Sequence, residues 1–382
     1  MPEAVVVSAL RTPIGTAVKG TLRDTTAFDL AHHVVAAAAA GLDAGRIDDV
    51  ILAEGMYGGG VIARHAALTA GLPHVPGLAQ NRHCAAGLSA VVAAAASVRA
   101  GMDELVLAGG VNSASTAPKS RFRVGGEWVD PWVSPTHPDR PDAPNLDMSI
   151  TVGWNAAVKA GVTRAEMDAW ALRSHRNAVR AIDEGRFDAE LLPIDTPHGR
   201  FAVDEHPRRD TSLEKLAALK PLHPEIEGFS ITAGNACGAN DGAAVLAVAS
   251  AALGMGMPAL ATVRAWASVG VDPAETGLAP VQAIPKALAR AGMSLGDVDL
   301  FEINEAFAAM CVATVRLLGI DPERVNVSGS GCSLGHPVAA TGTRMVVTLI
   351  HELRRRGGGV GVAAMCAGGG MGSAAVIEVP AG

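Results

Sequence analysis

Two segments of the chain repeat one order of strands, turns and helices, and this repeat constrains the fold more than any other feature. Residues 47–110 contain an apolar strand, a stretch with Cys84, an Ala-rich helix and a strand that ends in Ala-Gly-Gly. Residues 295–369 repeat this order around His336. Strands that alternate with helices predict parallel βαβ units. We therefore expect an α/β fold of two similar halves, in which Cys84 and His336 begin equivalent helices and face one site.

The composition changes between the two repeats. Six prolines fall within residues 118–144, and four of the five tryptophans fall within residues 128–170. Loop regions of this length often cover a site or form an interface. Within the insertion, apolar residues at helical spacing predict a helix at 164–184. The expected domains are a first half at 1–114 plus 241–259, an inserted loop domain at 115–240, and a second half at 260–382.

Charge and composition exclude one class of partner. The formal net charge is −7, whereas nucleic-acid binding needs a broad basic face, so we expect no nucleic-acid partner. Hydrophobic residues make up 49% of the chain and aromatic residues only 3%. This composition is typical of closely packed α/β layers.

The N-terminus and the cysteines indicate the cellular compartment of the protein. The first residues, Met-Pro-Glu-Ala-Val-Val-Val-Ser, place no basic residue before the apolar run, so they predict a strand and not a signal peptide. No apolar run approaches the roughly 20 residues of a membrane span, and we expect no membrane contact. Five cysteines, an odd number, indicate reduced thiols in the cytoplasm.

Four short motifs carry the groups that acyl transfer between thioesters requires. They are Asn-Arg-His-Cys (Asn81–Cys84), Asn-Glu-Ala-Phe (Asn304–Phe307), Gly-His-Pro (Gly335–Pro337) and Cys-Ala-Gly-Gly-Gly (Cys366–Gly370). One thiol can carry an acyl group, a second thiol and an imidazole can move protons, and amide or backbone N–H groups can hold oxyanions. With these motifs in this order, the chain resembles the thiolase family of acetyl-CoA C-acyltransferases from end to end.

The resemblance implies both fold and reaction. It implies duplicated βαβ halves that form a layered α-β-α-β-α core with an inserted loop domain. The implied activity is ping-pong, reversible Claisen condensation or thiolytic cleavage of 3-ketoacyl-CoA through an acyl-cysteine, as in fatty acid metabolism and β-oxidation. Coenzyme A is then a substrate, no metal or redox cofactor is needed, and the protein is expected to be a homodimer or homotetramer.

Cys84 and His336 are the expected nucleophile and base. Cys84 directly precedes a strong helix-forming run, and the positive end of a helix lowers the pKa of a thiol. His336 also opens a predicted helix, with Pro337 in the first turn. A neutral imidazole there can take the thiol proton. Taken alone, a cysteine or histidine in such a position is more often structural. The resemblance to thiolases is what assigns Cys84 as the nucleophile and His336 as the base.

The resemblance also assigns roles to Cys366, Asn304 and Gly368. Cys366 follows an apolar strand and alone suggests a buried core thiol. In the family it moves the proton of the acetyl-CoA methyl group. The N–H groups of Gly368 and Cys84 form one oxyanion hole, and Asn304 forms the second with His336 through a water. Glu305 is expected to orient its loop.

Several residues are expected to contact CoA or the acyl group. By resemblance these are Met148, Ala233, Cys237 and Phe307. Two basic clusters lie where a CoA phosphate can dock, one of Lys119, Arg121 and Arg123 and one of Arg208 and Arg209. Two positions depart from the family pattern. Cys237 stands where Ser is common, and Asp147 stands where many members have His. Asp147 and the tryptophans Trp128, Trp132 and Trp154 favour a broader or unusual chain preference over a strict acetoacetyl-CoA enzyme.

Three alternatives stay open on the sequence. A related condensing enzyme such as a ketoacyl synthase shares the nucleophilic cysteine but lacks a second catalytic one, so Cys366 discriminates. A degenerate, non-catalytic CoA-binding subunit is the second. The third is a metal site at Cys332 and His336, with Cys84 and Cys366 as further ligands.

Overall fold

A single mixed sheet dominates this computed structural model, which describes residues 3–55, 60–254 and 256–382. Within these residues the sheet has ten strands in the order β12-β13-β14-β11-β1-β10-β5-β3-β4, with β2 beside β10. The strands are β1 (Ala4–Arg11), β2 (Gly15–Thr16), β3 (Asp49–Ala53), β4 (Gly77–Gln80), β5 (Leu105–Ser113), β10 (Asn240–Ser250), β11 (Ala261–Gly270), β12 (Leu300–Ile303), β13 (Gly359–Ala367) and β14 (Met371–Val379).

The sheet contains the repeat that the sequence predicts. In the first half β1, β10 and β5 are antiparallel neighbours, and β5, β3 and β4 follow in parallel. In the second half β11, β14 and β13 are antiparallel and β12 is parallel to β13. A parallel bridge from Phe301 to Val325 takes the place of the last strand. The halves join where Val5 and Val6 pair with Thr262 and Ala261.

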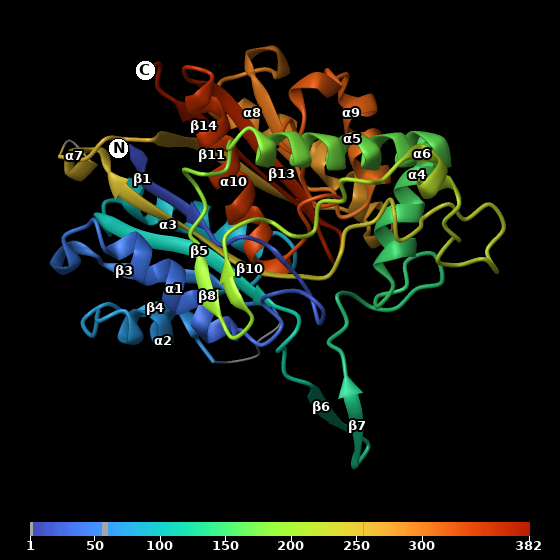
Figure 1. Cartoon of the computed structure of the whole chain (residues 1–382), viewed down its shortest axis with the longest axis horizontal. Coiled ribbons are helices and arrows are strands. Elements are labelled where there is room, and N and C mark those ends of the chain that lie inside the picture. The colour runs from blue at the N-terminus through green and yellow to red at the C-terminus, as the bar shows by residue number, and fades with distance from the viewer. Residues whose placement is uncertain (1–2, 56–59, 255) are drawn as a thin grey trace.

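Helices cover both faces of each half and form five layers. The helices are α1 (Ala27–Ala39), α2 (Ile62–Thr69), α3 (Ala86–Ala100), α8 (Ala279–Ala291), α9 (Ala308–Leu318) and α10 (Val338–Arg355). One core holds α3 and α10 between the inner faces of both half-sheets (Figure 1). A second core packs α1 and α2 on the outer face of the first half, and a third packs α8 and α9 on the second. The expected α-β-α-β-α order is confirmed.

Glycines let α3 and α10 approach closely. A Cβ atom on Gly87 would lie 2.6 Å from the carbonyl oxygen of Ala339, and one on Gly342 would lie 2.3 Å from the backbone nitrogen of Leu88. Real Cβ atoms do not come this close to backbone, so these positions require glycine. The contact fixes the relative position of the two helix N-termini, near which Cys84 and His336 lie.

The central helix α3 departs from the expectation that no apolar run approaches the length of a membrane span. The segment His83–Ala100 is long and apolar enough, by composition alone, to cross a membrane. More than half of it (56%) is buried inside the protein, because both faces of α3 contact other layers. A mostly buried apolar helix of this kind is typical of the core of a large protein.

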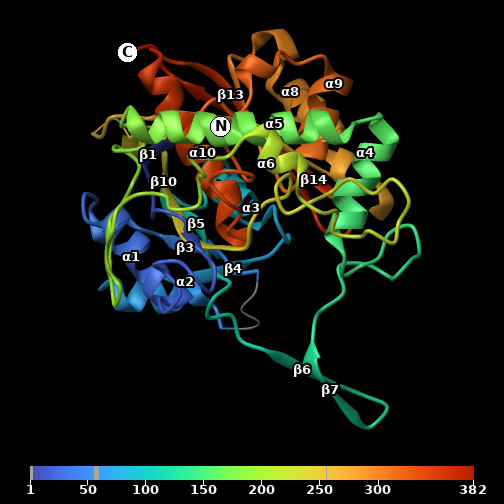
Figure 2. The same ribbon diagram turned by 45° about the vertical axis from the view of Figure 1, so that its right-hand side comes forward.

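The insertion leaves the sheet after Ser113 and returns at Asn240. It contains β6 (Ser120–Val124), β7 (Glu127–Trp132), a π-helix η2 (Ser149–Trp154), α4 (Asn155–Ala160), α5 (Arg164–Asp183), β8 (Ile194–Thr196), β9 (Gly199–Phe201) and α6 (Leu213–Ala217). The helix expected at 164–184 is confirmed as α5. The expectation of an irregular loop is wrong at 120–132, where β6 and β7 form an antiparallel hairpin that projects from the body (Figures 1 and 2).

Short elements complete the chain. They are the 3₁₀ turns η1 (Ala44–Arg46), η3 (Pro273–Leu278), η4 (Leu295–Asp297) and η5 (Pro322–Arg324), and the helix α7 (Ala251–Gly254). A buried ion network ties the insertion to the core: Arg11 of β1 donates to Glu190 at 2.5 Å and to both oxygens of Asp204 at 2.8 and 2.9 Å.

Candidate active site

Cys84 lies two residues before α3, in a turn that its own motif builds. The side chain of Asn81 accepts a hydrogen bond from the backbone N–H of His83 at 2.8 Å, and His83 takes a left-handed backbone with φ of 47°. This turn presents Cys84 at the start of the helix. The backbone N–H groups of Gly368 and of Cys84 itself both point to the sulfur and favour its ionised form.

The resting state of the Cys84 thiol differs from the sequence expectation. We expected the helix N-terminus to lower its pKa, but burial raises the pKa of Cys84 and outweighs the two backbone N–H groups. Desolvation disfavours the charged form of any group taken out of water. Cys84 is therefore a protonated thiol in the resting protein, and it needs a base to become a nucleophile.

His336 has the geometry of that base. Its Nδ1 lies 2.7 Å from Oγ1 of Thr341, and this hydroxyl donates its single proton to the carbonyl of Pro337 at 2.9 Å. Nδ1 must then carry the ring proton, which leaves the lone pair on Nε2. Burial, with the charge of Arg344, lowers the pKa of His336 to about 4. The imidazole is neutral at pH 7 and can accept a proton at Nε2.

Asn304 lies beside the imidazole. It directly follows β12, where its N–H donates to the carbonyl of Ala364 at 3.0 Å. Its side-chain Nδ2 lies 3.5 Å from Nε2 of His336. Within the described part of the chain, the buried Oδ1 of Asn304 has no hydrogen-bond partner. The amide therefore offers a donor and a free acceptor next to the base.

Cys366 belongs to the same site. It lies near the end of β13, fully buried, with its Sγ 3.6 Å from Sδ of Met310. Burial raises the pKa of Cys366 well above its usual value, and the thiols of Cys84 and Cys237 raise it further. Two residues after Cys366, a Cβ atom on Gly368 would lie 3.8 Å from the ring of His83, so the end of β13 lies beside the turn that carries Cys84. The structure therefore places Cys84 and Cys366 in one site with Asn304 and His336.

Glu305 supports the loop that follows Asn304. Its buried carboxylate accepts hydrogen bonds from Trp170 at 2.9 Å, Ser174 at 2.5 Å, Asn326 at 2.8 Å and the N–H of Cys332 at 3.1 Å. Both oxygens of the Glu305 carboxylate are therefore used in hydrogen bonds within the protein. This geometry fits the expectation that Glu305 orients the loop after Asn304.

Sequence reasoning missed two residues that hold His336. Asn240 accepts from the N–H of His336 at 2.9 Å and donates to the carbonyl of Gly15 at 3.0 Å. Thr341 fixes the ring, as described above. Thr341 lies one helical turn after Pro337, and this spacing was a detectable signal. Asn240 lies 96 residues from His336, and no local pattern indicates that contact.

A cavity of about 350 Å³ opens near the site, lined in part by the segment after Thr232. Ala233 and Cys237, both expected to contact CoA, line it together with His175, His206 and Cys332. Phe307 is next to it through a backbone bridge to Ala236, which also lines the cavity. Met148 does not line it and packs instead against the core of the second half.

A second cavity of about 390 Å³ shares His175, Arg208 and Thr211 with the first. It adds three further arginines: Arg176, Arg180 and Arg209. Its acidic lining residues are Asp183 and Glu184, and Asp183 pairs with Arg209 at 2.7 Å. The first cavity is therefore lined by thiols and the neighbouring second cavity by arginines.

Comparison with known proteins agrees with this geometry. Residues 4–252 match the family described as thiolase, N-terminal domain, and residues 257–379 match thiolase, C-terminal domain. The chain belongs to the thiolase family. It is 42% identical to the acetyl-CoA acetyltransferase of Pseudomonas aeruginosa, over 98% of both chains. It is 38% identical to the 3-ketoacyl-CoA thiolase of Bacillus subtilis, over 99% of this chain and 100% of that one.

A solved structure supports the same family assignment. The crystal structure of human mitochondrial 3-ketoacyl-CoA thiolase in complex with CoA superposes with a TM-score of 0.90 at 36% identity, covering 99% of this chain and 98% of that one. These relatives are named as enzymes, and nothing in them favours the degenerate, non-catalytic alternative. The chain is therefore a thiolase-type acyltransferase. Among the described residues, no group of three or more His, Cys, Asp or Glu side chains can hold a metal ion.

In this thiolase chain, Asp147 does not present a free charge to the cavity. Its Oδ1 accepts from the N–H of Ser149 at 2.9 Å at the start of η2, and its Oδ2 pairs with Nε2 of His223 at 2.8 Å. Its pKa is lowered because these partners outweigh its partial burial. Asp147 therefore binds the first turn of η2 and the imidazole of His223, and it gives no support to the expected unusual chain preference.

The tryptophans also lie away from the cavity. Trp128 is exposed on the hairpin and Trp132 stacks on Phe122, also on the hairpin. Trp154 packs against Phe229 in the core of the second half. None of these tryptophans lines the cavity near Cys237, so they give no support to a preference for long acyl chains.

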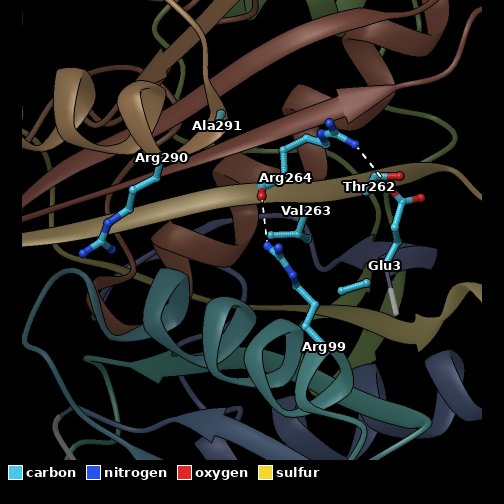
Figure 3. A pocket seen from close by; sticks show the side chains of 8 residues that line it. Glu3, Arg99, Thr262, Val263, Arg264, Arg290 and Ala291 are labelled. Atoms are coloured by element: carbon cyan, nitrogen blue, oxygen red, sulfur yellow. Dashed lines mark hydrogen bonds and ion pairs between the residues drawn. The ribbon is translucent and has the colours of Figure 1, made fainter. Parts of the chain in front are cut away.

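A third cavity, about 330 Å³, lies at the seam of the two thiolase halves and has a different character (Figure 3). Three arginines line it, but Arg99 donates to the carbonyl of Arg264, Arg264 to Glu3, and Arg290 to the carbonyl of Trp266. Its lining includes no thiol and no imidazole. This cavity is no candidate for acyl transfer.

Proposed function

We propose that this thiolase transfers an acyl group reversibly between Cys84 and CoA, cleaving or forming a 3-ketoacyl-CoA. The observation that carries the proposal is the meeting of two thiols, Cys84 and Cys366, with an imidazole whose Nε2 carries its lone pair beside the amide of Asn304. Two thiols allow one to hold the acyl group while the other moves a carbon-bound proton. A ketoacyl synthase has no use for the second thiol.

In the cleavage direction, Nε2 of His336 takes the proton of Cys84, and the thiolate attacks the 3-keto carbon. The C2–C3 bond breaks and its electron pair becomes the enolate of acetyl-CoA. Cys366 donates its proton to that carbon, so acetyl-CoA leaves and the acyl group stays on Cys84. These are proton and acyl transfers, and we propose that no metal or redox cofactor takes part.

In the second half-reaction, the Cys366 thiolate takes the thiol proton of an incoming CoA. The CoA sulfur attacks the acyl carbon and Cys84 leaves as a thiolate. Protonated His336 returns its proton to Cys84, which restores the resting protein. The N–H groups of Cys84 and Gly368, which both lie next to the Cys84 sulfur, would hold the acyl oxygen. Asn304, through a water on its amide, and His336 would hold the enolate oxygen.

We assign CoA to the two neighbouring cavities, which share His175, Arg208 and Thr211. The pantetheine arm fits the first, beside Ala233 and Cys237, and its reactive sulfur would face Cys84. The phosphates fit the basic second cavity, where Arg208 lines both. Lys119, Arg121 and Arg123 line neither cavity and lie on the exposed strand β6 or just before it.

We further propose a cytoplasmic homodimer or homotetramer. The hairpin exposes Phe122, Val124, Trp128 and Val129 to solvent in the single chain. Large apolar side chains gathered on a projecting element mark an interface between proteins, and a second copy of this chain is the partner we expect.

A thiolysis assay with CoA and acetoacetyl-CoA tests the proposal. Cys84→Ala and Cys366→Ala should each abolish turnover. Cys311→Ala is the matched control, because Cys311 is also a buried thiol but donates to backbone carbonyls of Ile303 and Asn304. Wild-type protein without thiolysis of any 3-ketoacyl-CoA would instead favour the non-catalytic CoA-binding subunit.

A further inference from the structure

One edge of β11 runs along the seam of the two thiolase halves with little strand pairing. β1 pairs with this edge only at Ala261 and Thr262, whereas β14 pairs with the other edge from Thr262 to Gly270. Beyond Thr262, no strand of the described chain covers the first edge. The seam cavity of about 330 Å³ lies here, because Thr262, Val263 and Arg264 line it.

Two arginines bind backbone carbonyls of β11 from different layers of the protein. Nη1 of Arg99, in α3, donates to the carbonyl of Arg264 at 3.0 Å, and Nη1 of Arg290, in α8, donates to the carbonyl of Trp266 at 2.7 Å. Figure 3 shows both side chains reaching the strand. Alternate carbonyls of a strand point to the same edge and lie about 7 Å apart. The two guanidinium groups are therefore held side by side along the seam.

The helix positions of these arginines do not explain where their side chains go. Arg99 and Arg290 both belong to the last turn of their helices, where a cation complements the helix dipole. Each of them nevertheless donates to β11 and not to a carbonyl of its own helix. The guanidinium of Arg99 also lies 5.6 Å from the centre of the Trp266 ring, a cation–π contact that holds it at the strand.

The charges of these two arginines have no carboxylate partner. Arg264, which also lines the cavity, pairs with both Glu3 and Glu378 at 3.1 Å. Among the described residues, neither Arg99 nor Arg290 forms an ion pair, and the Nε and Nη2 groups of both have no hydrogen-bond acceptor. The cavity therefore combines positive charge with guanidinium donors that the protein does not use.

A lysine continues the row of cations outside the cavity. Lys286 lies one turn before Arg290 in α8, and its Nζ donates to the carbonyl of Ser268 at 3.3 Å. Ser268 follows Trp266 by two residues, so its carbonyl belongs to the same edge of β11. Lys286 has no ion pair within the part of the chain that the structure describes. Three cations thus follow three alternate carbonyls along one open edge.

We propose that the seam cavity binds a small multivalent phosphate, either free pyrophosphate or the phosphate chain of a nucleotide. Guanidinium groups bind phosphate oxygens through paired, charge-assisted hydrogen bonds. Two guanidinium groups on carbonyls about 7 Å apart suit two linked phosphates better than a single one. A volume of about 330 Å³ is at the low end for small-molecule sites and fits so small a group. The site goes beyond the proposed function, because its lining residues belong neither to the acyl-transfer site nor to the CoA cavities.

Calorimetric titration of the whole protein with inorganic pyrophosphate tests the proposal. Wild-type protein should bind pyrophosphate saturably at constant ionic strength. The double variant Arg99→Met/Arg290→Met should lose affinity by roughly tenfold or more, because charge-assisted hydrogen bonds to the ligand are removed. Arg208→Met changes the CoA cavities instead and should keep the wild-type affinity. Arg46→Met, which removes an exposed arginine elsewhere, is the matched control for net charge.

Thermal unfolding gives an independent readout and a check on folding. Pyrophosphate should raise the Tm of the wild type, since a ligand that binds only the folded state stabilises it, and it should not raise the Tm of the double variant. If the double variant does not fold, Arg290→Met alone changes an exposed side chain and serves in its place. No binding to the wild type, unchanged affinity in the seam variants, or a loss confined to Arg208→Met would overturn the proposal.

A titration with ATP identifies the source of the phosphate. Tighter binding of ATP than of pyrophosphate, lost in the same seam variants, assigns the site to a nucleotide. Binding of pyrophosphate without binding of ATP assigns it to the free anion.

Discussion

Nδ1 of His336 donates a hydrogen bond to Oγ1 of Thr341 at 2.7 Å, and Thr341 donates in turn to the carbonyl of Pro337 at 2.9 Å. This chain runs within the first turn and a half of α10. It fixes both the tautomer and the orientation of the imidazole, so that the lone pair of Nε2 faces the amide of Asn304. The first turn of α10 thus fixes the tautomer and orientation that His336 needs to act as a base.

Thr341→Val tests this relationship. Valine keeps the shape of threonine and removes the hydroxyl, so Nδ1–H loses its acceptor in a buried site. The loss should cost about 1–2 kcal/mol, which is roughly fivefold to thirtyfold in kcat/KM. Thr341→Ser restores the hydroxyl and should restore most of the activity. Equal kcat/KM in Thr341→Val and the wild type would show that the hydrogen bond does not position the ring.

Gly342→Ala tests the packing of α3 on α10. The new Cβ would lie 2.3 Å from the backbone nitrogen of Leu88, so the helices must move apart. Overpacking of this kind costs about 1–3 kcal/mol, and it should also lower activity because Cys84 and His336 lie near the ends of these helices. Gly41→Ala is the control, since no atom lies within 4 Å of its Cβ position. Thermal unfolding measures both, and an unchanged Tm for Gly342→Ala would contradict the account.

Arg11→Met tests the anchor of the insertion. The change leaves Glu190 and Asp204 as buried carboxylates without their cation, and breaking a buried pair costs about 3–5 kcal/mol. Arg46→Met removes an exposed arginine that pairs with Glu104 at 2.7 Å, and an exposed pair contributes at most about 1 kcal/mol. Chemical denaturation should show this difference. Similar losses for both variants would mean that the buried network contributes little.

The pH dependence follows from the lowered pKa of His336. Its folded value is about 4 and its ordinary value is 6.5. Above pH 6.5 the ring is neutral in both states. As pH falls from 6.5 to 4, the unfolded chain binds the proton first, so the free energy of unfolding decreases by up to about 3 kcal/mol. His175, also lowered to about 4 by burial, should act in the same direction.

The pH dependence of kcat/KM should follow the same lowered pKa of His336. An ordinary histidine base would lose half its activity near pH 6.5, whereas His336 should sustain kcat/KM to about pH 5 wherever the protein stays folded. Stability and kcat/KM are measured together from pH 4 to 8. An acid limb centred at 6.5 would show that the folded imidazole is not held neutral.

The sequence predicts the repeat and the four motifs because these depend on local order. The βαβ pattern places Cys84 and His336 before equivalent helices, and the structure has them two residues before Ala86 and Val338. The hairpin at 120–132 was also detectable, since Gly125-Gly126 separates two short β-prone runs in the manner of a two-residue turn. The prolines and tryptophans around it led us to expect an irregular loop instead.

Long-range contacts were not predictable. Burial raises the pKa of Cys84, whereas its position at the start of a helix alone indicates the opposite direction. The capping of η2 by Asp147 and its pairing with His223 join residues 76 positions apart in sequence. Asn240 supports His336 across 96 positions, and it is recognised only once the fold brings the two residues together.

The central claim is that Cys84 carries the acyl group while Cys366 moves the proton. Incubating Cys366→Ala with acyl-CoA and mapping the peptides by mass spectrometry tests it most directly. We predict an acyl adduct on Cys84 that accumulates, because acylation needs only His336 while turnover needs Cys366. An adduct on another cysteine, or normal turnover by this variant, would contradict the account.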